Sequence, residues 1–385
     1  MMVFRPAASS RSVARQPSVA IYMSDLSGGG VERQVITLAV GMQSAGLPVV
    51  LLVREIRGEL KDKVPAGIRV IDLHSRNTLH DIPPLIRFLR RERPAVLLAN
   101  LDHNNVAAVV AGRASATGTH VIICQHNALS RAFSSDLGWS YRLIPFLYRV
   151  LSPWFDASVA VSRGIANELS SQAHIPRRKV KLIYNAVIGD DFRSKAQEPV
   201  THRWLDNPEI PVFVTAGRLV PVKDHENLLR ALACYRKHRA ANLIILGSGP
   251  LRPNLEALAI ELGIADAVDF LGYQENPLPY FRRADAFVLS SYSEGFGNVL
   301  VEAMGCGTPV ISTDCEYGPA EILKNGQYGA LVPPRCPQAL ANAFDSGTAL
   351  RKRWPSELLK VRAAAFSTTA CVEAYIDLCR SLFVP

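Results

Sequence analysis

Short apolar runs alternate with helix-like segments along the whole chain of 385 residues, and this alternation limits the fold more than any other feature of the sequence. Strands rich in Val and Ile that are spaced by helices are typical of a parallel sheet covered on both faces. The first half therefore predicts a doubly wound α/β domain with strands at 18–24, 48–54, 67–73, 95–100, 120–125 and 157–162.

A second set of strands begins after the polar, proline-rich segment 196–211, which we interpret as a linker. The sequence thus predicts two Rossmann-like doubly wound domains, over 18–195 and 210–365, that face each other across a cleft. Apolar residues at helical spacing predict a last helix within 366–385. The strands of the second domain are expected at 212–218, 242–249, 268–273, 286–291 and 309–313.

The net charge of +9 is concentrated in the first half, where residues 1–200 carry 25 Lys and Arg against 15 Asp and Glu. Nucleic acid is a poor fit to this charge, because the chain has no zinc-finger spacing, RNP-like strand or lysine-rich arm. An anionic membrane surface or a phosphate-bearing substrate fits the basic half better, and simple solubility is the alternative.

Localisation is inferred from three features of the sequence. No apolar run approaches the ~18–20 residues that span a bilayer. The first residues lack the apolar core of a secretory signal, and we expect a frayed tail there. The seven Cys are scattered without a CxxC pair, as expected for reduced thiols. We therefore expect a cytoplasmic protein, peripheral on the inner leaflet if it binds membrane.

Two glycine-containing turns follow predicted strands. In SGGGVER, Gly29 and Gly30 would let a ligand approach the backbone, and the helix start supplies N–H donors for an anion. The alternative is a tight turn between strand and helix. For Gly247 in LGSGP, a contact with a ligand and simple room for the next helix are equally good interpretations.

A loop containing two cations follows the strand 212–217. Arg218 and Lys223 flank Pro221, which stiffens the loop, and together the two cations could neutralise a diphosphate. A solvated surface pair is the alternative. The chain has no DxD pair and no cluster of metal-ligand residues, so we expect no metal ion and assign the neutralisation to these cations and to helix N-termini.

Two glutamates bracket the turn in SEGFGNVLVEAM. We expect a helix to begin near Gly297–Asn298, with its free N–H groups directed at a diphosphate or a sugar hydroxyl. Glu302, one turn into the helix, could accept from ribose hydroxyls, and Glu294 from hydroxyls of a sugar. The alternatives are a favourable charge at the helix start for Glu294 and a salt bridge for Glu302.

The last candidate is His126, which ends the strand 120–125 of the first domain. It is either a hydrogen-bonded loop residue or a group that faces the cleft from the opposite side.

The spacing of Glu294 and Glu302, with seven residues between them, resembles the EX7E motif of retaining glycosyltransferases of family four, which have the GT-B fold. The resemblance spans about Val19 to Pro334, with supporting segments in the family's order: GGGVER, RERPAVLLANLDHNN, AVSRGIANEL, IYNAV and GRLVPVKDHENLLRAL. The last helix would then cross back onto the first domain.

The resemblance implies roles for the candidate residues. Arg218 and Lys223 would bind the diphosphate of the donor, and Glu302 its ribose. His126 and Glu294 would be the catalytic residues beside the donor sugar, with Glu294 positioning that sugar. The full expected donor-binding set is Gly29, Gly30, Arg218, Lys223, Gly247, Phe296, Gly297, Asn298, Val299 and Glu302.

The acceptor is expected on the first domain. The stretch 131–155 combines Arg131, Arg142 and Arg149 with aromatic residues on one amphipathic segment, which suits an anionic membrane surface. A helix packed on the sheet is an equally good interpretation. With the basic first half, this stretch favours a lipid-linked or lipopolysaccharide acceptor.

The expected activity is transfer of a hexose or N-acetylhexosamine, with retention, from a nucleotide diphosphate sugar, UDP favoured, to a glycan or lipid-linked acceptor. Two other functions remain open. A nucleotide-sugar epimerase of the same fold would release an altered nucleotide sugar without any acceptor, and a non-catalytic subunit would bind the donor without turnover.

Overall fold

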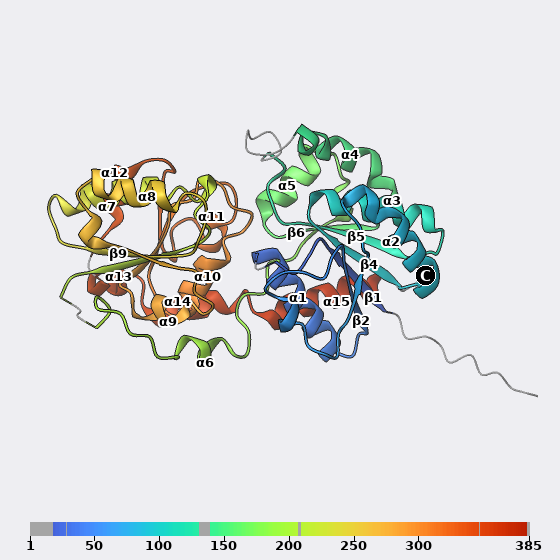
Figure 1. The fold of residues 1–385 in the computed structure, drawn as a ribbon, viewed down its shortest axis with the longest axis horizontal. Helices are drawn as coiled ribbons and strands as arrows, with labels where there is room; N and C mark the ends of the chain where they lie inside the picture. The colour runs from blue at the N-terminus through green and yellow to red at the C-terminus, as the bar shows by residue number, and fades with distance from the viewer. Residues whose placement is uncertain (1–17, 28, 131–138, 207–208, 346, 383–385) are drawn as a thin grey trace, which may run out of the picture.

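The computed structural model describes residues 18–27, 29–130, 139–206, 209–345 and 347–382, which form two α/β domains side by side (Figure 1). Each domain contains one parallel sheet. The first sheet has seven strands in the order β3 (Arg69–Asp72), β2 (Val49–Val53), β1 (Val19–Met23), β4 (Val96–Asn100), β5 (His120–Gln125), β6 (Ala157–Ala160) and β7 (Val180–Leu182). This strand order, with the helices around the sheet in the right-hand domain of Figure 1, confirms the doubly wound fold that the sequence predicts.

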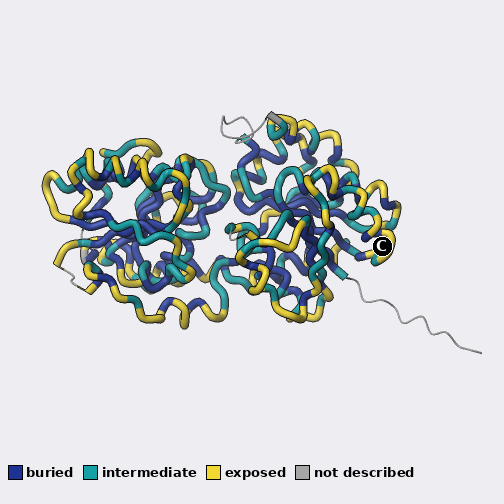
Figure 2. Tube along the Cα trace, viewed as in Figure 1, coloured by how far each residue is buried: buried dark blue, intermediate teal, exposed yellow. Residues whose placement is uncertain are grey.

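The second sheet has six parallel strands in the order β10 (Val268–Gly272), β9 (Asn242–Leu246), β8 (Val212–Ala216), β11 (Ala286–Leu289), β12 (Val310–Thr313) and β13 (Ala330–Val332). Every residue of β1, β4, β8, β9 and β11 is buried, which explains why these strands are mostly apolar rather than alternating. Figure 2 shows both sheets as buried layers between more exposed helices.

Helices cover both faces of each sheet. Those of the first domain are α1 (Gly30–Ser44), α2 (Thr78–Glu92), α3 (Asp102–Ser115), α4 (Ile144–Leu151) and α5 (Arg163–Ser171). A short helix, α6 (Phe192–Ala196), leads into the connection between the domains. The second domain contains α7 (His225–Arg236), α8 (Arg252–Glu261), α9 (Leu278–Arg283), α10 (Asn298–Gly305), α11 (Pro319–Ile322), α12 (Pro337–Ala343), α13 (Gly347–Arg353) and α14 (Ser356–Ala364). None of the described helices is long and apolar enough to cross a membrane.

The last helix, α15 (Thr368–Ser381), leaves the second domain and packs on the first (Figure 1). Val372 lies against Gly41 of α1, where a larger residue would have no space. Tyr375 is buried in the first domain's core and donates its hydroxyl to the Cys124 sulfur at 3.6 Å. The first domain therefore includes a helix from the far end of the chain.

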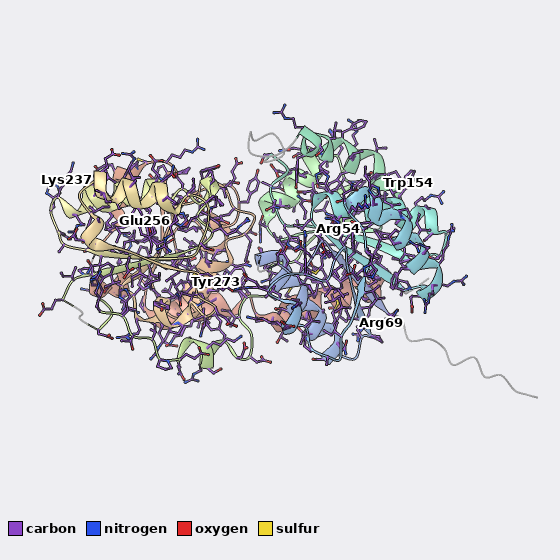
Figure 3. All side chains as sticks on the ribbon, viewed as in Figure 1. Arg54, Arg69, Trp154, Lys237, Glu256 and Tyr273 are labelled. Carbon is purple, nitrogen blue, oxygen red and sulfur yellow. The ribbon has the colours of Figure 1, made fainter. Side chains whose placement is uncertain are left out.

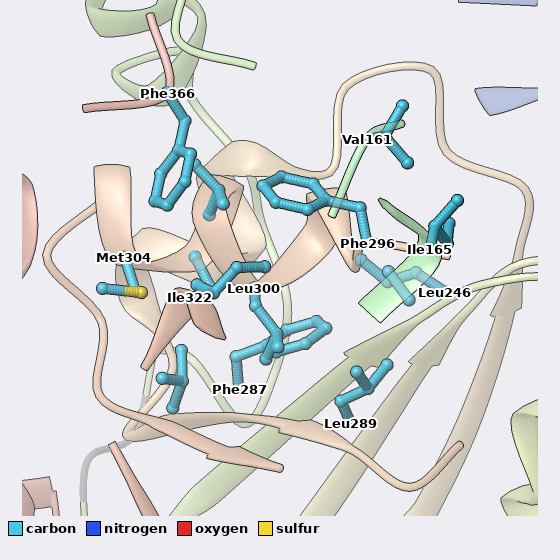
Figure 4. Packing of buried hydrophobic residues seen from close by; sticks show 14 of the residues in the cluster. Val161, Ile165, Leu246, Phe287, Leu289, Phe296, Leu300, Met304, Ile322 and Phe366 are labelled. Atoms are coloured by element: carbon cyan, nitrogen blue, oxygen red, sulfur yellow. The ribbon is translucent and has the colours of Figure 1, made fainter. Parts of the chain in front are cut away.

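The two domains touch through the loops at the carboxyl ends of their strands. Lys63 and Glu275 pair at 2.5 Å on one flank. Asn185 donates to Asn298 Oδ1 at 2.9 Å. The apolar core is also continuous: Phe296 of the second domain belongs to the same buried cluster as Val161 and Ile165 of the first (Figure 4). These contacts hold the carboxyl ends of the two sheets against each other.

Candidate functional site

An ion pair between Glu294 and Lys223 lies at the carboxyl end of the second sheet. Lys223 Nζ lies 2.5 Å from Glu294 Oε1, and the Ser291 hydroxyl donates to the same oxygen at 2.6 Å. The two side chains are only 21% and 11% exposed. A pair this shielded from water holds a more defined geometry than a surface ion pair does. The structure thus brings together a predicted carboxylate and a predicted cation.

The loop that carries Glu294 touches His126 across the domain boundary. Glu294 N–H donates to the Glu316 carbonyl at 2.6 Å, and Tyr317 N–H donates to the Glu294 carbonyl at 2.7 Å, so the loop is fixed by its neighbour. A Cβ atom added at Gly295 would overlap the His126 carbonyl oxygen. Glycine is therefore required at 295 by close approach of the two domains.

His126 is held in place by a residue that the sequence did not single out. Its Nε2 lies 3.0 Å from Asn100 Oδ1, and Asn100 is itself buried at the end of β4. Burial lowers the pKa of His126 to about 4, so the imidazole is neutral at pH 7. In the sequence, Asn100 could have been recognised as the polar residue that ends the otherwise apolar run 95–100.

Two buried histidines predict how stability depends on pH. Burial also lowers the pKa of His225 to about 4, with Lys223 adding to the shift. Both bind a proton more weakly in the folded than in the unfolded chain, so their stabilising effect is complete above about pH 6.5 and disappears as the pH falls to about 4.

We therefore expect the free energy of unfolding, measured in urea, to fall between pH 7 and pH 5 by about 2 kcal/mol for each histidine. His225→Gln should remove its share of this dependence, and the exposed His238→Gln should not. Equal pH dependence in both variants would contradict the assignment.

Glu302 lies on α10, one turn beyond the helix start. The helix begins at Asn298 after Gly297, whose φ of +102° disfavours any other residue, as the sequence predicts. Burial raises the pKa of the Glu302 carboxyl, and the positive charge of Arg33 opposes that shift. Arg33 belongs to α1 of the first domain, and its Nη2 donates to the Tyr273 hydroxyl at 2.5 Å. Figure 3 places Tyr273 on the side of the second domain that faces the first.

The helix α1 has Gly29 as its N-cap and Gly30 as its first residue. The Glu32 carboxylate folds back over Gly29 and accepts from its own backbone N–H. Burial raises the pKa of Glu32, and the charge of Arg218 from the second domain acts in the opposite sense. The anion site predicted at Gly29 and Gly30 therefore lies beside the Glu32 carboxylate. The sequence analysis did not predict this carboxylate.

Two of the predicted donor-binding residues, Phe296 and Gly247, have structural roles. Phe296 is buried and stacks on Tyr184 at a ring distance of 5.6 Å, so its ring packs in the core, and a donor could meet only its backbone. Gly247, with φ of +140°, lies so close to the Gly217 carbonyl that no side chain would fit. Glycine at 247 is thus required by the chain at the end of β8 rather than by the next helix, and a contact with the donor stays a prediction.

The neighbours of Phe296 lie at the helix start. Asn298 Oδ1 accepts from Asn185 of the first domain, and Val299 is partly exposed on the first turn of α10. In the described part of the chain, no three His, Cys, Asp or Glu residues gather as a metal site.

Comparison with known protein families gives two matches that follow each other along the chain. Residues 28–188 match the model described as Glycosyltransferase Family 4, and residues 200–353 match the model described as Glycosyl transferases group 1. The boundary between the two matches falls in the connection between the two sheets.

Two bacterial relatives cover most of the chain. An N-acetylgalactosamine-N,N'-diacetylbacillosaminyl-diphospho-undecaprenol 4-alpha-N-acetylgalactosaminyltransferase of Campylobacter jejuni is 28% identical over 327 residues, covering 81% of this chain and 85% of the relative. The lipopolysaccharide core biosynthesis glycosyltransferase LpsE of Rhizobium meliloti is 29% identical over 363 residues, covering 92% and 96%.

A solved structure agrees with the fold. HepE of Anabaena, in complex with UDP-glucose, superposes with a TM-score of 0.76 at 19% identity and covers 94% of this chain and 99% of its own. At that identity the likeness concerns the fold alone.

Proposed function

This chain belongs to the family-four glycosyltransferases and has the GT-B fold, and from that premise we propose the reaction that its site performs. The chain transfers a hexose or N-acetylhexosamine from a nucleotide diphosphate sugar, most readily a UDP-sugar, to a glycan or lipid-linked acceptor. Transfer retains the configuration at the anomeric carbon and needs no metal ion. UDP-glucose bound to HepE supports the class of donor.

The observation that carries the proposal is the pairing of Glu294 with Lys223 beside the start of α10, directly against the loop of His126. In this arrangement the diphosphate lies at the N–H groups of α10, within reach of Lys223 and Arg218. Glu302 accepts from the ribose hydroxyls, and Glu294 accepts from the donor sugar.

The chemical step breaks the bond between the anomeric carbon and the β-phosphate oxygen and forms a bond to the acceptor oxygen on the same face. The acceptor proton passes to the departing phosphate oxygen. Lys223, Arg218 and the amide dipoles stabilise the negative charge that develops there. Glu294 positions the sugar. His126 is neutral, because its pKa is about 4, so it adds no positive charge beside an oxocarbenium-like centre.

A buried polar network in the first domain supports an acceptor on that side. Arg54 binds Asp81 at 2.9 Å and Asn104 Oδ1 at 3.2 Å, and Asn104 donates to the Asn100 carbonyl at 3.0 Å. Asn100 in turn holds His126. Polar groups therefore run from β2 to β5 along the carboxyl ends of the strands, where an incoming hydroxyl would be bound.

The outer face of α4 supports an acceptor at a membrane. Leu143, Phe146, Val150 and Trp154 are 44%, 62%, 50% and 46% exposed, and their spacing places them on one helical face. Arg142 and Arg149 are exposed beside them, and Trp154 is labelled on the outside of the first domain in Figure 3.

Tyr148 of the same segment is buried, so the segment both packs on the sheet and presents a surface. Arg131 and the side chain of Trp139 lie outside the described residues.

We therefore propose that the protein acts on the cytoplasmic leaflet, in lipopolysaccharide or polysaccharide synthesis. One relative is named for lipopolysaccharide core biosynthesis, and the other for an acceptor linked to diphospho-undecaprenol. Arg142→Gln with Arg149→Gln should lower sedimentation with anionic vesicles severalfold, since each basic residue near such a surface contributes about 1 kcal/mol. The matched control is Arg177→Gln with Arg178→Gln, which removes the same charge from another exposed segment. An equal loss of vesicle sedimentation in both double variants would show that net charge alone is responsible and would contradict binding through the outer face of α4.

The test of the proposed reaction is a donor screen. Thermal shift with a panel of nucleotide sugars identifies the donor, and NMR of the product with its acceptor gives the anomeric configuration. We expect a stabilising UDP-sugar, a retained configuration and full activity in EDTA. An altered nucleotide sugar released without acceptor would identify an epimerase, and donor binding without turnover would identify a non-catalytic subunit. Inversion, or loss of activity on chelation, would refute the mechanism.

A further inference from the structure

Glu168 of α5 fixes the loop that carries His126. Its carboxylate is 3% exposed and accepts from the backbone N–H groups of Leu129 at 2.5 Å and Ser130 at 3.1 Å. Gln172, one turn further along α5, donates to the same carboxylate at 3.0 Å. A buried carboxylate that accepts several N–H bonds ties the chain segments that donate them. Glu168 therefore sets the conformation of the strand end where His126 lies.

The same carboxylate receives a hydrogen bond from the second domain. The Tyr317 hydroxyl donates to Glu168 Oε1 at 3.3 Å. The Tyr317 ring lies against Gly164 of α5, where a Cβ atom would overlap the ring. The backbone N–H of Tyr317 donates to the Glu294 carbonyl at 2.7 Å. One end of Tyr317 thus holds the Glu294 loop, and the other end holds the residue that fixes the His126 loop.

A second carboxylate joins the same helix to the second domain from the outside. Glu321 of α11 accepts from Arg163 N–H at 2.8 Å and from the Tyr184 hydroxyl at 2.5 Å. Figure 1 shows α5 on the side of the first domain that faces α11. The Arg163 side chain is 76% exposed, so this outer ion pair is screened by water, whereas Glu168 is buried. The Tyr317 hydroxyl thus reaches a buried carboxylate, unlike the outer pair.

We propose that Glu168 and Tyr317 form an interdomain latch that sets Glu294 and His126 in their productive arrangement. Both are positioning residues, since neither lies among the groups that would meet the substrate. The inference rests on the proposed function, because it assigns the latch to the sugar-transfer step. When the domains come together, the Tyr317 hydroxyl completes the set of donors around Glu168. Closure is thereby coupled to the geometry of both loops at once.

The test is Tyr317→Phe, which removes one oxygen and keeps the ring against Gly164. Because a hydrogen bond to a charged group is lost only in the closed state, we expect kcat to fall about tenfold while the KM for the donor changes less than about twofold. Glu168→Gln should lower kcat at least as much, and combining both changes should cost less than the product of the two. Tyr235→Phe, on the far side of the second domain among Phe213 and Phe344, is the matched control.

Small-angle X-ray scattering with saturating UDP supplies a readout that does not depend on turnover. We expect Tyr317→Phe to have a larger radius of gyration than the wild type. Wild-type kcat in Tyr317→Phe overturns the latch and leaves the transferase function in place. If the wild type transfers no sugar, the proposed function is refuted, and scattering alone tests the latch. Equal radii of gyration in the wild type and Tyr317→Phe would then overturn the latch, and a larger radius in Tyr317→Phe would support it.

Discussion

Replacing Glu294 with Gln lowers the rate of sugar transfer by at least about 100-fold, the size of effect that follows loss of one preorganised electrostatic group in an enzyme site. The substitution keeps the shape of the side chain but removes the charge that pairs with Lys223 Nζ at 2.5 Å. In the proposed mechanism, Lys223 then loses its fixed position beside the diphosphate, and the donor sugar loses an acceptor of its hydroxyl protons. We expect kcat to carry most of the loss.

The measurement is steady-state transfer with the donor found by the screen, together with a thermal melt. The matched control is Glu261→Gln, an exposed acid at the end of α8 in the same domain. A folded Glu294→Gln protein that transfers sugar within about threefold of the wild-type rate would exclude a role for this carboxylate in the site.

Gly295→Ala abolishes the close approach of the two domains and lowers transfer by about 10–100-fold. The added methyl group would overlap the His126 carbonyl oxygen, and neither backbone segment can move cheaply because both are hydrogen-bonded to their neighbours. Overpacking of this kind costs about 1–3 kcal/mol. The domains can relieve it by separating, so catalysis should suffer more than stability.

Transfer kinetics, the melting temperature and scattering together test this expectation. Gly67→Ala is the control, since its new methyl group meets only the end of the Gln43 side chain. If Gly295→Ala melts many degrees lower and is equally slow, the glycine serves folding. If it transfers at the wild-type rate, the contact at His126 is not needed for closure.

The fold was accessible from the sequence because the central strands of both sheets are buried on both sides. β1 and β8 are apolar at every position but one, and such runs have few alternatives to a central strand of a parallel sheet. The start of α10 was equally accessible: the sequence predicts it near Gly297–Asn298, and the structure begins the helix at Asn298 after a glycine with positive φ.

The partners of the candidate residues were not accessible, because they come from distant parts of the chain. Nothing in the sequence near Glu294 indicates the pairing with Lys223, 71 residues away. Glu168 lies on an ordinary amphipathic helix, and its burial depends on loops that reach it only in the folded protein. The burial of the Phe296 ring was equally hidden: its neighbours in the motif are polar or glycine, but its ring meets Tyr184 and Phe366.

The position of α15 has a consequence for biosynthesis. Cys371, Val372, Tyr375 and Ile376 fill the core beneath the first sheet, yet they are translated only after the whole second domain. A nascent chain that has emerged only as far as the linker would leave that core open to water. Expression of the amino-terminal half alone should therefore yield aggregating material, and co-expression with a separate peptide covering 366–385 should recover soluble protein.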